Sequence, residues 1–394
     1  MKRYHTYKDS GVEWIGKMPE GWSVLRLKWV CNFLYGESLS AQEREDGTIP
    51  VYGSNGIVGY HNRSITEKPC IIVGRKGSFG KVTFSEKKCY PIDTTYYIDC
   101  TSTKNYMRWL WYLLPLLKMD EFSRDSAVPG LNREDAYRNI VTLPSSYEQK
   151  QIATYLDYKT IQIDNLISKK QKLIELLKEE RAAIINQAVT KGLNPDATMK
   201  DSGIEWFGEI PEKWEVKRLK FVADFKSGNG ITANLIKNDG EYAAYGGNGL
   251  RGYTSSYTHE GSYVLIGRQG ALCGNINYAD GKFWASEHAV VATLVSDYNL
   301  FWFGELLRTM NLNQYSQSAA QPGLSVDHIK NFFIPLPSPN EQDVIAAYLA
   351  RKTTKIDQTI SKIENQIELL KEFRTALISE VVTGKIDVRD EELK

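Results

Sequence analysis

Residues Lys8–Lys28 read KDSGVEWIGKMPEGWSVLRLK, and residues Lys200–Lys220, 192 positions later, read KDSGIEWFGEIPEKWEVKRLK. Farther along, YGSNGIVGY from Tyr52 returns as YGGNGLRGY from Tyr245, at an offset of 193. Self-similarity at a fixed period is the signature of a repeat architecture. Two such copies account for almost all 394 residues, so the chain is a tandem duplication.

The likeness between the two copies is uneven. It is dense in the opening strip and in the C-terminal part of each copy, but sparse between about residues 29–128 and about residues 221–321. A duplicated frame that carries two dissimilar middles can present two different surfaces from one pseudo-symmetric scaffold. The pattern therefore predicts two unlike binding heads.

The similar C-terminal parts are predicted to be helical. Ser145 with Glu148, and Ser338 with Glu341, have the spacing of capping boxes, which begin helices. Apolar residues recur at spacings of three, four and seven between about Thr160 and Thr190, and again in the second copy. Each helix of about 30 residues would be roughly 45 Å long.

One such amphipathic helix cannot bury its apolar stripe alone, and the chain supplies one matching partner. We expect the two helices to pack as an antiparallel coiled coil. The alternative is that each helix covers only its neighbouring domain. The apolar periodicity of the first helix also includes Leu166 and Leu173, which are not among the predicted seam residues. The predicted seam residues are Ile163, Ile167, Ile174, Leu177 and Ile184 in the first helix and Ile356, Ile360, Ile367, Leu370 and Leu377 in the second.

The dissimilar middles are predicted to be mixed α/β domains of about 120 residues each. Short β-rich runs are bounded by Gly, Asn and Pro, and two short helical stretches accompany them. The expected fold is thus α/β, with two pseudo-symmetric repeats that each place a compact domain before a long helix. The runs are Cys70–Gly74, Tyr96–Ile98, Tyr263–Gly267 and Ala289–Ala292, and the helical stretches are Met107–Leu117 and Leu300–Met310.

Composition excludes several classes of protein. Hydrophobic residues make up 42% and charged residues 25%, and no run approaches the roughly 20 apolar residues of a membrane span. The N-terminal residues lack a secretory signal pattern, so we expect a cytoplasmic location. Five widely spaced cysteines without a C-x-x-C pair argue against a zinc site and are expected to be buried. A net charge of +1 means that any nucleic-acid surface must be local.

The sequence lacks a convincing catalytic constellation. Gly247-x-Gly249-x-x-Gly252 matches a dinucleotide fingerprint but is predicted to be a turn, and Gly74–Lys81 fails the spacing of a P-loop. The five histidines stand apart from one another and from the cysteines. Asp93 and Glu287 are expected to form hydrogen bonds at strand ends. We therefore predict that this chain is not an enzyme and binds no cofactor or metal itself.

Two motifs supply the candidate DNA-binding residues. Arginine in a glycine-flanked turn can fork onto phosphate or a guanine edge, but it can equally pair with an acid to hold the turn. Asparagine in Tyr-Gly-x-Asn-Gly can read adenine, but Asn-Gly is also a common tight turn, which is favoured. The tryptophans of the repeated strips, Trp14, Trp22, Trp206 and Trp214, are predicted to be docking anchors. The DNA candidates are Tyr52, Asn55, Arg75, Lys76 and Lys81 in the first copy and Tyr245, Asn248, Arg251, Arg268 and Gln269 in the second.

The strips DSGVEWIGKMPEGW and DSGIEWFGEIPEKW, the LPS-x-x-EQ helix starts and the IELLKE helices together resemble the specificity (S) subunit of type I restriction-modification systems. The resemblance covers the whole chain. It implies two target-recognition domains, each reading one half of a bipartite double-stranded DNA sequence. It also implies that the helical regions act as a spacer and dock two methyltransferase (M) subunits, with restriction (R) subunits contacted indirectly. Partner subunits would use S-adenosylmethionine to methylate adenine, and ATP and Mg to translocate and cut.

The resemblance also implies a division of the chain into five parts. They are a docking strip (1–20), the first recognition domain (21–143), the first helical region (144–199), the second recognition domain with its repeated strip (200–336) and the second helical region (337–394). Two other functions remain open. A protein-interaction scaffold without DNA contact would explain the helices, and a self-contained DNA-modifying enzyme would need catalytic residues that the sequence does not display.

Overall fold

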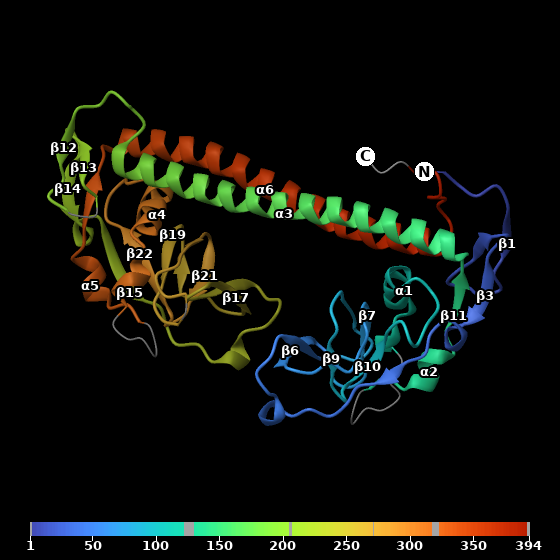
Figure 1. Cartoon of the computed structure of the whole chain (residues 1–394). Helices are drawn as coiled ribbons and strands as arrows, with labels where there is room; N and C mark the ends of the chain where they lie inside the picture. Colours follow the sequence, from blue (N-terminus) through green and yellow to red (C-terminus); the bar gives the residue numbers. More distant parts are fainter. Residues whose placement is uncertain (1, 122–129, 205–206, 271, 317–322, 392–394) are drawn as a thin grey trace. The chain divides into compact units, whose positions relative to one another are not determined.

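The computed structural model describes residues 2–121, 130–204, 207–270, 272–316 and 323–391. It divides into two compact units: unit 1 holds Met1–Lys170 with Asn365–Lys394, and unit 2 holds Gln171–Glu364. Two long helices, α3 (Ser146–Lys191) and α6 (Pro339–Val382), contribute residues to both units (Figure 1). No helix in these described ranges carries an apolar stretch that would cross a membrane.

Unit 1 contains a strand-rich head and two smaller two-stranded sheets. In the head, an antiparallel sheet has the order β4-β10-β7-β8, and a second sheet has the order β6-β5-β9 with β5 parallel to β9. The small sheets pair β1 with β2 and β3 with β11. The elements are β1 (Tyr7–Asp9), β2 (Lys17–Pro19), β3 (Ser23–Arg26), β4 (Leu34–Tyr35), β5 (Ile49–Gly53), β6 (Gly56–His61), β7 (Cys70–Gly74), β8 (Val82–Ser85), β9 (Tyr90–Pro91), β10 (Thr95–Ile98), α1 (Met107–Leu113), α2 (Arg133–Tyr137) and β11 (Ile140–Leu143).

Unit 2 repeats this layout. Its sheets have the orders β15-β22-β19-β20 and β17-β16-β21-β18, and its small sheets pair β12 with β13 and β14 with β23. The strand and helix stretches predicted for both middles are therefore confirmed. The elements are β12 (Met199–Asp201), β13 (Glu209–Pro211), β14 (Glu215–Arg218), β15 (Ala223–Ser227), β16 (Tyr242–Gly246), β17 (Gly249–Thr254), β18 (His259–Glu260), β19 (Tyr263–Gly267), β20 (Ile276–Ala279), β21 (Lys282–Ala285), β22 (Ala289–Leu294), α4 (Leu300–Thr309), α5 (Val326–Lys330) and β23 (Phe333–Leu336).

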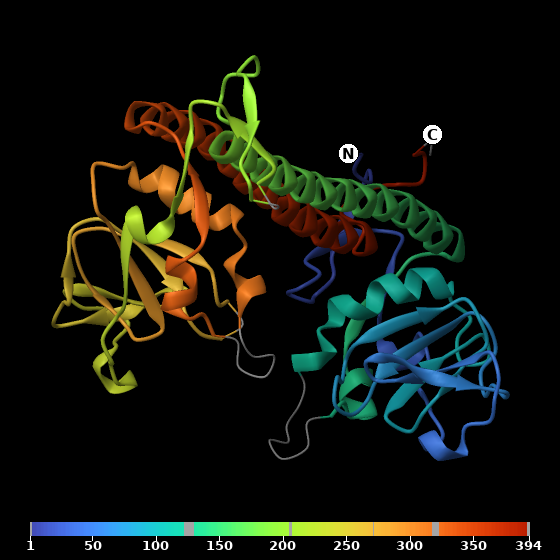
Figure 2. The same ribbon diagram turned by 90° about the vertical axis from the view of Figure 1, so that its left-hand side faces the viewer.

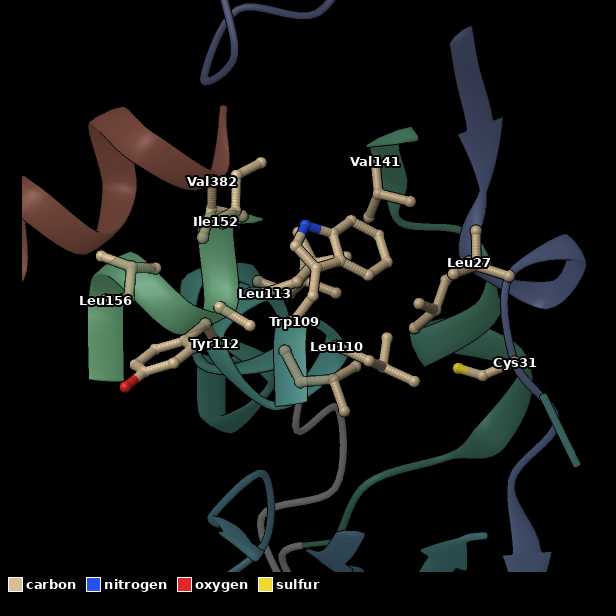
Figure 3. Packing of buried hydrophobic residues seen from close by; sticks show 14 of the residues in the cluster. Leu27, Cys31, Trp109, Leu110, Tyr112, Leu113, Val141, Ile152, Leu156 and Val382 are labelled. Carbon is tan, nitrogen blue, oxygen red and sulfur yellow. The ribbon is translucent and has the colours of Figure 1, made fainter. Parts of the chain in front are cut away.

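The core of unit 1 joins the head to the long helices. Trp109 of α1 is fully buried, and Ile152 and Leu156 of α3 and Val382 of α6 belong to the same cluster (Figure 3). The first turns of α3 thus belong to the core of the head. This packing explains why α3 and α6 have 46 and 44 residues, whereas the sequence periodicity predicted about 30.

The long helices run antiparallel, as predicted. In unit 1, Arg374 Nε donates to Asp164 Oδ1 at 3.0 Å, and Lys170 Nζ donates to Gln366 Oε1 at 2.6 Å. In unit 2, Arg181 Nε donates to Asp357 Oδ1 at 3.0 Å. Residue numbers rise along α3 as they fall along α6, and both views show the helices side by side (Figures 1 and 2). All ten predicted seam residues are buried or half-buried.

Two apolar residues of the helical pattern lie outside the seam. Leu166 and Leu173 are 43% and 45% exposed. Each directly precedes a seam residue, Ile167 or Ile174, and one residue turns an α-helix by about 100°. Antiparallel pairing buries a narrow stripe, so these leucines point away from the partner helix, in agreement with their absence from the predicted seam.

Each repeated strip docks on the end of a long helix through a tryptophan. Trp22 is 1% exposed and packs against Gly384, just after α6, while Trp214 is 1% exposed and packs against Gly192, just after α3. Trp22 also donates from Nε1 to Oε1 of Glu148, the capping-box acid of α3, at 3.0 Å. These two tryptophans are anchors, as predicted. Trp14 is 39% exposed, and Trp206 lies outside the described residues.

Gly384→Ala is expected to lower the stability of unit 1. Gly384 has φ of +77°, and a Cβ there would meet Pro19 and lie 2.9 Å from Trp22. The left-handed backbone alone costs about 1–2 kcal/mol for a residue with a side chain, and the overlap adds to this. Gly11→Ala is the matched control, because Gly11 has φ of +71° and open space around it. Thermal unfolding should show a larger loss for Gly384→Ala; equal losses would mean that the strip does not pack tightly there.

Candidate DNA interface

In unit 1 the candidate site is built on the turn that follows β7. The N–H of Arg75 donates to the carbonyl of Thr94 at 2.8 Å, and the carbonyl of Arg75 accepts from the N–H of Leu131 at 2.8 Å. A Cβ at Gly74 would overlap the carbonyl oxygen of Ser78, so the turn requires glycine there. The backbone is fixed on both sides, and the turn presents the half-buried Arg75 and the exposed Lys76.

The guanidinium of Arg75 lies among rings and a main-chain oxygen. It donates to the carbonyl of Asp93 at 3.1 Å and lies 5.0 Å from the ring centroid of Tyr35 and 5.8 Å from that of Tyr96. Arg133 approaches the same Tyr35 ring at 5.1 Å. Within the described ranges no carboxylate forms an ion pair with Arg75. Burial raises the pKa of the Tyr96 hydroxyl above its ordinary value.

The Tyr-Gly-x-Asn-Gly motif of unit 1 lies beside this turn. It forms the β5–β6 hairpin, which confirms the predicted turn, and Ser54 Oγ donates to the carbonyl of Thr94 at 2.7 Å. Lys81 Nζ donates to Oδ1 of Asn55 at 2.7 Å and to its carbonyl at 2.9 Å. The structure therefore brings the two motifs together around Thr94, and Lys81 holds the asparagine.

Unit 2 builds the same backbone frame after β19. The N–H of Arg268 donates to the carbonyl of His288 at 2.8 Å, and its carbonyl accepts from the N–H of Leu324 at 2.9 Å. Leu131 and Leu324 are equivalent at the offset of 193. Gly247 of the β16–β17 hairpin lies against Gly267, so here too the hairpin adjoins the arginine turn. The glycine pattern that matches a dinucleotide fingerprint belongs to this hairpin.

The side chains on the two frames differ. In unit 2, Oε1 of Gln269 lies 2.9 Å from Nδ1 of His288, and Nε2 of the same histidine lies 3.4 Å from Oε1 of Glu287. Asn275, in place of the unit 1 lysine, donates from Nδ2 to Oδ1 of Asn248 at 3.2 Å. Unit 1 thus presents arginine, lysine and tyrosine, whereas unit 2 presents arginine, glutamine, histidine and glutamate.

The remaining candidates lie at the edges of these sites. Tyr52 is only 7% exposed and packs with Cys70 and Cys89, so its geometry favours a role in the core. Tyr245 is half-buried with its ring centroid 5.6 Å from that of Phe283. Arg251 is exposed, and its side chain lies over Gly246. Four of the five cysteines are buried as expected, but Cys100 is exposed.

Sequence reasoning missed Tyr35, Arg133 and His288 as members of the sites. Tyr35 reaches the Arg75 turn because β4 pairs with β10, where Tyr35 lies opposite Tyr96. His288 follows Glu287, whose Oε2 accepts from the N–H of Ile231 at 3.3 Å. Tyr35 comes from strand β4, Arg133 from the start of α2 and His288 from the turn between β21 and β22, so the tertiary fold brings them to the arginine turns. The described residues contain no cluster of three or more His, Cys, Asp or Glu side chains suited to a metal.

Comparison with known proteins decides the family. A model described as "Type I restriction modification DNA specificity domain" matches residues 19–177 and again residues 211–369. The chain belongs to this family. The interpretation of the duplicated sequence as a type I specificity subunit with two recognition domains is therefore confirmed, one DNA specificity domain falling in each repeat.

Individual members of the family match to different extents. The chain is 42% identical over 152 residues to the type I restriction enzyme EcoprrI specificity subunit of Escherichia coli, a match that spans 38% of each chain. It is 26% identical over 420 residues to the type I restriction enzyme MjaVIII specificity subunit of Methanocaldococcus jannaschii, covering 95% of each.

Solved structures support the fold. The HsdS subunit from Thermoanaerobacter tengcongensis matches 94% of this chain and 98% of its own with a TM-score of 0.54 at 16% identity. A second solved structure is described as "Structural basis underlying complex assembly and conformational transition of the type I R-M system". One of its chains has a TM-score of 0.67 at 15% identity, and the match covers 94% of this chain and 99% of that chain.

Proposed function

We propose that this chain reads a bipartite double-stranded DNA target, with one half-site for each recognition domain. The chain itself would be non-catalytic and would dock two methyltransferase subunits through its helical regions, with restriction subunits joining indirectly. Adenine methylation with S-adenosylmethionine, and ATP- and Mg-dependent cutting, would belong to those partners. A cytoplasmic location stays a prediction.

One observation carries this proposal: two equivalent backbone frames present different side chains. Arg75 with Lys76, and Arg268 with Gln269, extend from turns held by matching main-chain hydrogen bonds. Arginine pairs bidentately with guanine and glutamine with adenine, so the two turns suit different base edges. A pure scaffold would give no reason for the frames to be retained while their side chains diverged.

The isolated chain is expected to bind DNA weakly, because it carries a net charge of only +1 and phosphate contacts supply much of DNA affinity. Gel-shift titrations of the chain, with and without methyltransferase subunits, should show tight binding only for the complex, with a steep salt dependence. Binding in neither state would favour the scaffold alternative. Methyl transfer from labelled S-adenosylmethionine by the chain alone would favour the enzyme alternative.

A further inference from the structure

Each unit exposes a large apolar side chain at an equivalent position. Trp29 is 70% exposed and Phe221, 192 positions later, is 60% exposed. A second equivalent pair accompanies them, because Ile140 is 37% exposed and Phe333, 193 positions later, is 42% exposed. Single exposed apolar residues are ordinary, whereas a clustered and repeated set marks an interaction site.

In unit 2 these residues form one continuous face. Phe221 ends the 3₁₀ turn η5 (Leu219–Phe221) that follows β14, and Phe333 begins β23, opposite Arg218 of β14. Phe221 and Phe333 line one shallow groove together with Val216, Lys217 and Arg218. We call this groove the Phe221 face.

Unit 1 has the same arrangement. Trp29 ends the 3₁₀ turn η1 (Leu27–Trp29) after β3, and Ile140 begins β11, opposite Arg26 of β3. We call the surface of Arg26, Lys28, Trp29 and Ile140 the Trp29 face. The first residue of each turn, Leu27 or Leu219, is fully buried, so the turns are anchored. The core of either unit is therefore complete without the exposed aromatic ring.

The rim of both faces is basic. Lys28 Nζ lies 4.9 Å from the Trp29 ring centroid, and Lys220 Nζ lies 5.2 Å from that of Phe221. The Arg218 guanidinium lies 4.9 Å from the Phe333 ring centroid. Apolar surface bordered by lysine and arginine complements an apolar anchor flanked by carboxylates, because charge-assisted hydrogen bonds then form around a desolvated contact.

We propose that the Trp29 face and the Phe221 face dock two identical copies of one protein partner, each through an apolar anchor flanked by carboxylates. We expect both faces to bind the same protein, because the two faces stayed alike after the duplication while the two heads diverged. A nucleic acid fits less well, because a phosphate backbone offers no apolar anchor to bury beside the rings. This inference rests on the proposed function in taking the partner to be the methyltransferase subunit. To the contacts proposed for the helical regions it adds one face at each of the strands β11 and β23, which lead directly into α3 and α6.

The test counts methyltransferase subunits bound to the full chain by native mass spectrometry, without DNA. The wild type is expected to bind two copies, Trp29→Ser one, Phe221→Ser one and the double variant none, with at least a tenfold loss of affinity at each altered face. Leu235→Ser is the matched control, because Leu235 is 55% exposed and lies on neither face; it should bind two copies.

The other outcomes separate this inference from the proposed function. Retention of two copies with unchanged affinity by both single variants would overturn the inference, while sequence-specific DNA binding by the wild-type complex would still support the proposed function. If the variants still bound two methyltransferase subunits but bound DNA more weakly, the two faces would instead be assigned to nucleic-acid binding. Lys28→Glu and Lys220→Glu, which keep the rings, should also each weaken one copy at least tenfold; full binding by both would contradict the acidic anchor.

Discussion

Replacing Arg75 with alanine is expected to relax the reading of one half of the DNA target and to leave the other half intact. The guanidinium extends from a turn fixed on both sides and is not paired with any carboxylate in the described ranges. A bidentate contact to a base contributes about 1–3 kcal/mol of discrimination, or roughly 5- to 150-fold. Adenine-methylation mapping in cells that express the complex should therefore show one relaxed half-site. Arg268→Ala should relax the other half-site.

Two controls separate base reading from a structural role of Arg75. Arg75→Lys keeps the charge near the Tyr35 ring but lacks the planar fork, so it should retain methylation while losing discrimination. Tyr35→Phe keeps the ring beside the guanidinium and should change discrimination little. If Arg75→Ala and Arg268→Ala instead lowered the unfolding temperature equally and left both half-sites unchanged, the arginines would be structural.

Much of the frame could be predicted because its signals are local. Capping boxes marked both helix starts, and α6 begins at Pro339 as its Ser338–Glu341 box indicates. The helix lengths were underestimated because buried residues of the first turns, such as Ile152 and Leu156, pack against the head and do not follow the coiled-coil spacing. The apolar periodicity also contains Leu166, which is exposed, because rotation about the helix axis decides which apolar residues face the partner helix.

The sites were harder to predict than the frame. The arginine turns and the hairpins could be found because both repeats contain them. Within each unit, the structure places the hairpin beside the arginine turn. The side chains that surround Arg75 come from strands and loops remote in sequence, and pairing of β4 with β10 decides that Tyr35 lies there. Tyr52 lies in β5, where the four consecutive residues from Pro50 to Gly53 are all buried, and a motif of turn residues does not reveal this burial.

Deleting one heptad from both long helices is expected to shorten the unread gap of the target while both half-site sequences stay the same. Residues 166–172 of α3 and 366–372 of α6 lie opposite each other in the register set by the Asp164–Arg374 pair, so their removal keeps the two seams matched. Seven residues correspond to about 10.5 Å of helix, or roughly three base pairs at 3.4 Å each. Methylation mapping would reveal the new gap.

Deletion of residues 166–172 from α3 alone is the informative control. The two helices would then differ in length by seven residues, and the Arg181–Asp357 and Arg374–Asp164 contacts could no longer form together. Because knobs-into-holes packing requires matched register, this variant should lose both half-sites and much of its thermal stability. A matched deletion that left the gap unchanged would show that the helices do not set the spacing, and that the gap depends on how the partner subunits hold the DNA.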